Sequence, residues 1–175
     1  MHRRRRLARQ EKGGEYVFSD GSLLESRNMG GGGCILVGSD GREQEIECGI
    51  GDVATVWDGE VAGMAGGLAK IKRNGQVLIL LADSKAAIAA VRKAGKTGKA
   101  TLWDLREVIN TISEVKDRGG EFSIGWVTSH IGILGNEAAD AVAKKAAEGV
   151  RLDDHEKWMT GGYKAVGEAA EKVYS

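Results

Sequence analysis

The sequence predicts an α/β domain in which helices pack on a five-stranded mixed sheet. Its first third reads as three short apolar strands, and an Asp-Gly pair at 40–41 is typical of a hairpin turn. Further along, helical periodicity alternates with short apolar runs, which favours crossover connections between parallel strands. The run VLILLA at 77–82 is typical of a central strand covered on both faces. The expected order is therefore β-β-β-α-β-α-α-β-α.

The antiparallel part is expected to consist of strands at 16–19, 34–37 and 44–49. Asp20-Gly21-Ser22 follows the first strand directly, so Asp20 is expected at the end of that strand. The four consecutive glycines at 30–33 are interpreted as a loop that leads into the second strand.

The only two cysteines, Cys34 and Cys48, are expected near one another across this hairpin. A disulfide between them is conceivable. Since no secretory signal precedes them, free buried thiols are favoured, and their spacing matches no zinc motif.

A first helix is expected over 54–73, where Val61, Met64 and Leu68 recur at helical spacing. Glu60 precedes Met64 by one turn and therefore shares its face near the helix start. A glutamate on the core side is unusual unless something pairs with it.

The central strand at 77–82 ends in Asp83-Ser84, and a helix over 85–94 is expected to begin there. The segment 94–101 reads as a basic, glycine-containing connector. A third helix follows, and Arg118-Gly119-Gly120 ends it.

The last strand, at 122–126, leads into a loop that carries His130. Asn136 is interpreted as the N-cap of a final, alanine-rich helix that begins at Glu137. Asp140 is expected near the start of this helix, where the helix dipole favours an ionised carboxylate.

Length and composition indicate one globular domain. Since nothing in the sequence resembles a secretory signal, we expect an intracellular protein, nuclear or cytoplasmic, and we expect a monomer. The chain has 175 residues, 42% of them hydrophobic, with a formal net charge of zero. It has no apolar run of about 18 residues, so no membrane span is expected. We expect a basic arm or tag at 1–14, a catalytic domain at 15–149 and a helical extension at 150–175.

If the first and fourth strands are parallel neighbours, Asp20 and Asp83 meet at one edge of the sheet, joined by Glu60 and Asp140. Taken singly, Asp140 and His130 read better as a solvated charge and an ordinary loop histidine, because structural charges outnumber functional ones. Four acids together repel one another unless a cation lies among them, and oxygen ligands favour Mg²⁺ or Mn²⁺ over zinc. Two such ions can activate a water for phosphodiester hydrolysis. The pattern therefore predicts a metal-dependent nuclease.

The motifs that hold the four acids and the histidine resemble the type 1 ribonuclease H family: Asp20-Gly21-Ser22, Glu60, Asp83-Ser84, His130 and Gly135-Asn136-Glu137-Ala138-Ala139-Asp140. The resemblance covers about 16–149. The form of the last motif looks most like the ribonuclease H domains of eukaryotic, particularly fungal, non-LTR retrotransposons.

The resemblance implies cleavage of the RNA strand of RNA/DNA hybrids, leaving a 5′-phosphate and a 3′-hydroxyl. It implies that the four acids bind two metal ions and that His130 assists proton transfer or product release. It also implies a neighbouring reverse-transcriptase module. Substrate contacts are expected from these residues: Gly21, Ser22, Ser84, Asn136, Arg92, Lys93, Lys96 and Lys99.

Two features depart from the family pattern. Thr128-Ser129 stands where the family usually has Pro-Gly before the histidine, which affects the mobility expected of the loop. The connector at 94–101 is also too short for the extra basic helix with which some members grip the hybrid.

Two alternative functions remain open. One is a binding module that has kept the fold and lost the chemistry, although such relatives usually lack one or more of the acids. The other is a related nuclease that acts on a different nucleic acid.

Overall fold

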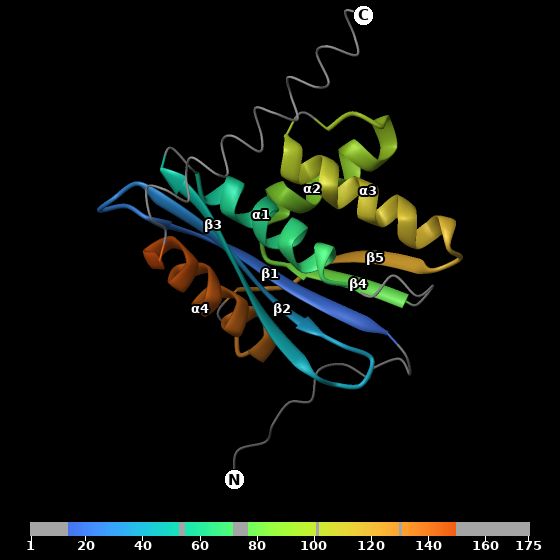
Figure 1. The fold of residues 1–175 in the computed structure, drawn as a ribbon, viewed down its shortest axis with the longest axis horizontal. Coiled ribbons are helices and arrows are strands. Elements are labelled where there is room, and N and C mark those ends of the chain that lie inside the picture. The colour runs from blue at the N-terminus through green and yellow to red at the C-terminus, as the bar shows by residue number, and fades with distance from the viewer. Residues whose placement is uncertain (1–13, 53–54, 72–76, 101, 130, 150–175) are drawn as a thin grey trace, which may run out of the picture.

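The computed structural model describes residues 14–52, 55–71, 77–100, 102–129 and 131–149 (Figure 1). The order β-β-β-α-β-α-α-β-α is confirmed, and the elements are β1 (Glu15–Leu24), β2 (Met29–Val37), β3 (Glu43–Asp52), α1 (Val56–Ala69), β4 (Val77–Ala82), α2 (Lys85–Thr97), α3 (Trp103–Asp117), β5 (Glu121–Trp126) and α4 (Leu134–Gly149). The arm expected at 1–14, apart from Gly14, and the extension expected at 150–175 lie outside the described residues. No helix within these residues has the length and apolar character needed to cross a membrane.

The five strands form one mixed sheet in the order β3-β2-β1-β4-β5. β1 pairs antiparallel with β2, and β2 with β3, as a meander. β1 and β5 both pair with β4 in parallel. The predicted fold class is therefore confirmed. The first and fourth strands are parallel neighbours, which was the condition for Asp20 and Asp83 to meet.

Helices cover the two faces of the sheet unequally (Figure 1). α4 packs on β1, β2 and β3 from one side, and α1, α2 and α3 lie on the other. The larger apolar core lies on the three-helix side around Met64, Leu80 and Val108. A smaller one, around Phe18 and Val142, lies beneath α4.

The glycines of β2 let helices approach both faces of the sheet closely. A Cβ on Gly33 would lie 2.3 Å from the backbone nitrogen of Ala143 in α4. A Cβ on Gly32 would lie 2.4 Å from the backbone nitrogen of Gly63 in α1. Because successive residues of a strand point to opposite faces, this one strand seats both helices.

The interpretation of 30–33 as a loop is therefore wrong. These glycines lie within β2, and the whole strand is buried. Their usual cost in a strand is offset here because only a residue without a side chain allows both helix backbones to reach the sheet.

Other predicted boundaries also need correction. β1 continues to Leu24, so Asp20 lies within the strand and not at its end. α2 continues through Thr97, so Lys96 joins Arg92 and Lys93 on this helix, and of these basic residues only Lys99 lies in a connector. Gly98 ends α2 in the left-handed conformation, with its N–H bonded to the Ala94 carbonyl.

Both cysteines are free, as expected. Burial and the neighbouring Cys48 raise the pKa of Cys34 to about 12. Burial and the charge of Asp104 raise the pKa of Cys48 to about 11, partly opposed by Lys70. Both thiols are thus held in the protonated, unreactive form at neutral pH.

We expect Gly33→Ala to lower the free energy of unfolding by at least about 2 kcal/mol, because the added carbon meets helix backbone that cannot move aside. Urea unfolding followed by circular dichroism measures the change. Gly95→Ala is the matched control, since a Cβ there meets only Ile109 at 3.8 Å and alanine favours the helix. Equal stability of the two variants would show that α4 does not rest on the strand backbone.

We expect iodoacetamide to modify both thiols at least about 100-fold more slowly in the folded protein than in urea at about pH 8, because a rise of two pKa units lowers the thiolate fraction about 100-fold. The rate in the folded protein should rise with pH until each thiol ionises. Mass spectrometry of timed samples gives the rates. Rapid modification of Cys34 without urea would contradict its burial.

Candidate active site

Two neighbouring strands deliver the first two acids of the site. The parallel pairing of β1 with β4 ends at Ser19 and Ala82. Asp20 is the next residue of β1, and Asp83 directly follows the last residue of β4, so their backbones leave the last pair side by side. Ser84 then starts α2 by accepting a hydrogen bond from the Ala87 N–H, at 3.2 Å, which ends the strand at this point.

Glu60 comes to the same place from α1. The backbone nitrogen of Glu60 would lie 2.4 Å from a Cβ on Gly21, the residue after Asp20. This glycine therefore lets the second turn of α1 rest directly on β1. Thr55 fixes the helix start through a capping box with Asp58.

The three acids form a compact cluster. Oxygen atoms of Asp20, Glu60 and Asp83 all lie within 4.8 Å of one another. Asp20 and Glu60 keep only 7% and 6% of their surface exposed, and Asp83 is half-buried. All the ligand atoms on offer are carboxylate oxygens, which suit a hard divalent cation.

Glu60 is buried beside the other two acids of the cluster. Burial, followed by the charges of Asp20 and Asp83, raises the pKa of Glu60 to about 9, while a hydrogen bond from the Gly21 backbone acts in the opposite direction. Its Oε2 atom is buried and has no hydrogen-bond partner among the described residues. A buried acceptor beside two other carboxylates is the arrangement that a bound cation would satisfy.

Asn136 lies against this cluster from α4. Its side-chain amide donates to Asp83 Oδ2 at 3.2 Å, and its Oδ1 is buried without a partner in the described structure. The prediction that Asn136 caps the helix is wrong, because α4 already begins at Leu134. The side chain of Asn136 holds the Asp83 carboxylate instead of the helix end.

Asp140 lies beside the cluster and not within it. It falls in the second turn of α4, after Ala139, whose carbonyl would lie 2.6 Å from a Cβ on Gly33. Since Gly33 pairs with Asp20, this contact brings Asp140 to the edge of the site. Its carboxylate accepts a hydrogen bond from Lys144 Nζ at 2.7 Å. That bond and the charge of Asp140 raise the pKa of Lys144, and Asp20 adds to the effect.

The comparison with known proteins agrees with this arrangement. A family model described as RNase H matches residues 12–148, most of the chain. The chain belongs to the RNase H family. The Ribonuclease HI of Synechocystis sp. is 28% identical to it over 142 residues, a match that spans 74% of this chain and 85% of that protein. Together these similarities support a ribonuclease H enzyme.

The structure describes some of the remaining predicted site residues and not others. Gly21 is fixed against α1, Ser22 lies half-buried in β1, and the Ser84 hydroxyl is engaged at the start of α2. His130 lies outside the described residues. In the described segment that follows it, the Gly132 N–H donates a hydrogen bond to the Glu137 side chain, at 2.9 Å.

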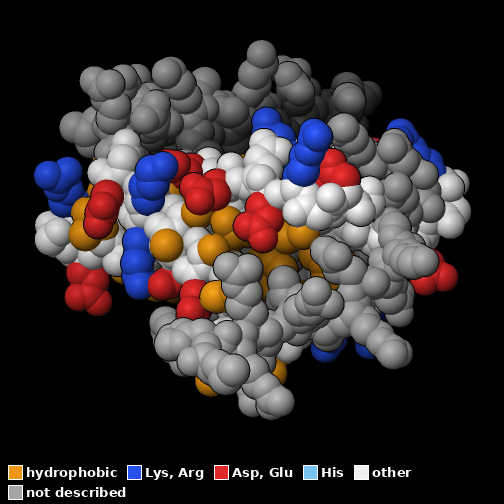
Figure 2. Space-filling model, turned by 90° about the horizontal axis from the view of Figure 1, so that it is seen from below, with side chains coloured by type: hydrophobic (Ala, Val, Ile, Leu, Met, Phe, Trp, Pro, Cys, Tyr) orange, Lys and Arg blue, Asp and Glu red, His pale blue; other side chains and the backbone are white. Residues whose placement is uncertain are grey.

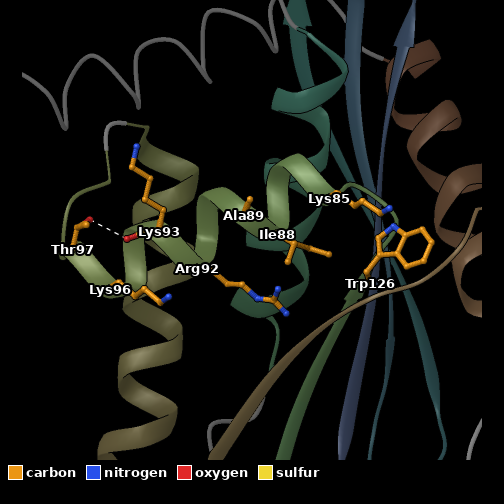
Figure 3. Close-up of a pocket in the computed structure, with 8 residues that line it drawn as sticks. All are labelled: Lys85, Ile88, Ala89, Arg92, Lys93, Lys96, Thr97 and Trp126. Atoms are coloured by element: carbon orange, nitrogen blue, oxygen red, sulfur yellow. Dashed lines mark hydrogen bonds between the residues drawn. The ribbon is translucent and has the colours of Figure 1, made fainter.

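The basic residues line a groove that sequence reasoning missed. Lys85, Arg92, Lys93 and Lys96 of α2 border it, and Trp126 at the end of β5 closes it, whereas Lys99 does not line it (Figure 3). The signal was present in the sequence, because residues 85, 92 and 96 recur at helical spacing once α2 is continued to its true end.

The face on which α4 lies has a different charge pattern. In the view from below, basic and acidic side chains are interspersed among the described residues (Figure 2). Two pairs of opposite charge involve α4: Lys144 forms an ion pair with Asp140, and Lys145 forms one with Glu47. This face therefore lacks the single-sign character of the groove.

We expect Lys144→Met to raise the affinity of the protein for Mg²⁺ or Mn²⁺ by about 3- to 10-fold, because it removes a positive charge that competes for Asp140. Isothermal titration calorimetry without substrate measures this affinity.

Lys145→Met is the matched control, since it removes the same charge one residue away, where the partner is Glu47. If both variants bind the ion equally well, Lys144 does not compete with it.

Proposed function

We propose that this ribonuclease H domain is a metal-dependent endonuclease that hydrolyses the RNA strand of RNA/DNA hybrids. The observation that carries the proposal is the convergence of Asp20, Glu60 and Asp83 from three separate elements, in a chain of this family. The identity of the relative, a Ribonuclease HI, supports the same reaction.

Asp20, Glu60, Asp83 and Asp140 would hold two divalent cations, Mg²⁺ in our proposal and Mn²⁺ as a substitute. When bound, such ions supply an activated water and neutralise charge on the leaving oxygen. The all-oxygen donor set and the unsatisfied oxygen of Glu60 support this assignment.

The other residues of the site act on these acids or on the substrate. The Asn136 amide orients the Asp83 carboxylate through its hydrogen bond. We propose that His130, on the loop before α4, assists proton transfer or product release. It needs no fixed contact with the acids for that role.

Hybrid selection follows from the chemistry of the two strands. RNA offers a 2′-hydroxyl in a wide, shallow minor groove, and polar groups beside the acids, Ser22 and Glu60 among them, would test for it. Duplex DNA lacks this group. Contacts from Gly21, Ser84 and Asn136 would fix the strand at the site, and Arg92, Lys93, Lys96 and Lys99 would bind phosphates without reading sequence.

We propose further that the domain serves reverse transcription of a retroelement, next to a reverse-transcriptase module. The Gly-Asn-Glu-x-Ala-Asp form at 135–140 supports this context through its resemblance to such elements. In the same proposal the catalytic unit spans 15–149, with a separate arm before it and an extension after it.

The test is cleavage of labelled RNA/DNA hybrid, duplex DNA and duplex RNA of one sequence, each with Mg²⁺, Mn²⁺ or a chelator. We expect the hybrid to be cut far faster than either duplex, and only with a metal ion. Asp83→Asn should slow this cleavage by more than about 100-fold, since loss of a partner of a metal ligand alone costs 10- to 100-fold.

The same variant should keep or gain thermal stability in chelator, because it relieves the repulsion among three acids. Glu148→Gln, at an exposed site on α4, is the matched acid-to-amide control. Equal cleavage of hybrid and duplex DNA would point to a general nuclease. Tight hybrid binding without cleavage under any of the metal conditions would point to a binding module.

A further inference from the structure

A groove of about 680 Å³ runs along α2 on the side of β5 (Figure 3). Its floor is apolar, from Ile88 and Ala89, and its rim carries four basic side chains: Lys85, Arg92, Lys93 and Lys96. None of the four makes an ion pair with a carboxylate in the part of the chain that the structure describes. The groove therefore presents uncompensated positive charge above an apolar surface.

The basic side chains follow one direction along the helix. Lys85, Arg92 and Lys96 recur at helical spacing over about 16 Å of α2, given a rise of 1.5 Å per residue. Figure 3 shows Arg92 and Lys96 on the same side as Ile88, whereas Lys93 points away from them. Arg92 is anchored by a hydrogen bond from Nη2 to the Ile124 carbonyl, at 3.1 Å.

An exposed aromatic side chain stands at the end of the groove nearest the acids. Trp126 keeps 47% of its surface exposed even though the Lys85 ammonium lies 4.4 Å from its ring centroid. Its indole N–H donates to the Asp83 carbonyl at 2.9 Å, which fixes the ring. A large aromatic surface left exposed and yet held in place is typical of a binding platform.

The groove is continuous with the acidic cluster. Asp83 supplies a carboxylate to the cluster and, through its carbonyl, the anchor of Trp126. Lys85 follows two residues later and begins the basic rim. A strand that leaves the cluster in this direction therefore meets the tryptophan first and the basic residues next.

We propose that the groove between α2 and β5 binds an unpaired nucleic-acid strand that extends from the hybrid held at the acidic cluster. This inference rests on the proposed function. One base of the strand stacks on Trp126, and the following phosphates are bound by Arg92 and Lys96.

The features of the groove favour an unpaired strand over more duplex. Bases expose their faces for stacking only when they are unpaired, and basic grooves with aromatic platforms are the usual sites for single strands. A site size on the order of 4 nucleotides is typical at the small end of such sites, which suits the length of the helix. The groove begins next to the acidic cluster, where the hybrid would be cleaved. A nucleic-acid strand is therefore favoured over an acidic peptide as its ligand.

The experiment measures fluorescence anisotropy of the full chain with labelled hybrids in chelator, so that no cleavage occurs. One hybrid is blunt, and four others carry an unpaired tail of about 6 nucleotides, of DNA or RNA, at the 5′ or the 3′ end. At least one tail should lower Kd by about 5-fold or more, the effect expected for one stacked base.

Two sets of variants should remove this gain in different ways. Trp126→Ala should remove most of it but leave the tailed hybrid with a steeper salt dependence than the blunt one, because Arg92 and Lys96 still neutralise tail phosphates. Trp126→Phe should restore most of the gain. The double variant Arg92→Ala, Lys96→Ala should abolish it and also flatten the salt slope, by about 0.7 for each phosphate that is no longer neutralised. Lys116→Ala, on α3 outside the groove, is the control and should keep the full gain. Circular dichroism checks that each variant is folded.

Three results would overturn the inference. In the first, every tailed hybrid binds like the blunt one. In the second, the gain persists in both Trp126→Ala and the double variant, which places the tail elsewhere. In the third, a poly-glutamate peptide binds in a groove-dependent manner while the tails have no effect, which assigns the groove to an acidic protein segment. If any of these results is found while the blunt hybrid is still cleaved in a separate assay with Mg²⁺, the proposed function holds and only the inference about the groove fails. If no hybrid is bound or cleaved, the proposed function itself fails.

Discussion

The structure depends on the contact of two helices with the bare backbone of β2 and its neighbour. Gly33 seats α4 on one face of the sheet, while Gly32 and its pairing partner Gly21 seat α1 on the other. Any side chain at these positions would push a helix away from the sheet. Because Glu60 lies on α1 and Asp140 on α4, the same contacts that hold the layers together set the distances between the acids. The packing of the helices on the sheet therefore also determines the geometry of the site.

The electrostatics of the site oppose the fold in the absence of a cation. Burial, followed by the charges of Asp20 and Asp83, raises the pKa of Glu60 to about 9. The chain compensates in part with its own groups, an amide from Asn136 on Asp83 and an ammonium from Lys144 on Asp140. Neither group reaches the buried oxygen of Glu60. The cluster thus lowers the stability of the fold without a metal ion, and a bound divalent ion would relieve this cost.

The sequence was sufficient for the order of elements and the mixed sheet, because both follow from local apolar patterns and topology rules. The meeting of Asp20 with Asp83 depended on the neighbouring positions of β1 and β4, which the structure supplies. It was insufficient where a tertiary contact overrides local propensity. The glycines at 30–33 favour a loop in isolation and become strand only because two helices rest on them. Asn136 is a good cap by type, but its partner, Asp83, is 53 residues away. The groove could be recognised only once α2 was known to continue to Thr97, because Lys96 then lies on the same helix as Lys85 and Arg92.

The segment Asp83-Ser84 connects these features. Its first side chain joins the acids, its first carbonyl anchors Trp126, and its second side chain starts α2, which carries the basic rim. A shift at the end of β4 would therefore move the cluster, the aromatic platform and the axis of the basic helix together. A strand bound along the groove, as we propose, would be aligned with the acids through that same junction. Because β4 is a central strand paired on both sides, the sheet holds this junction in place.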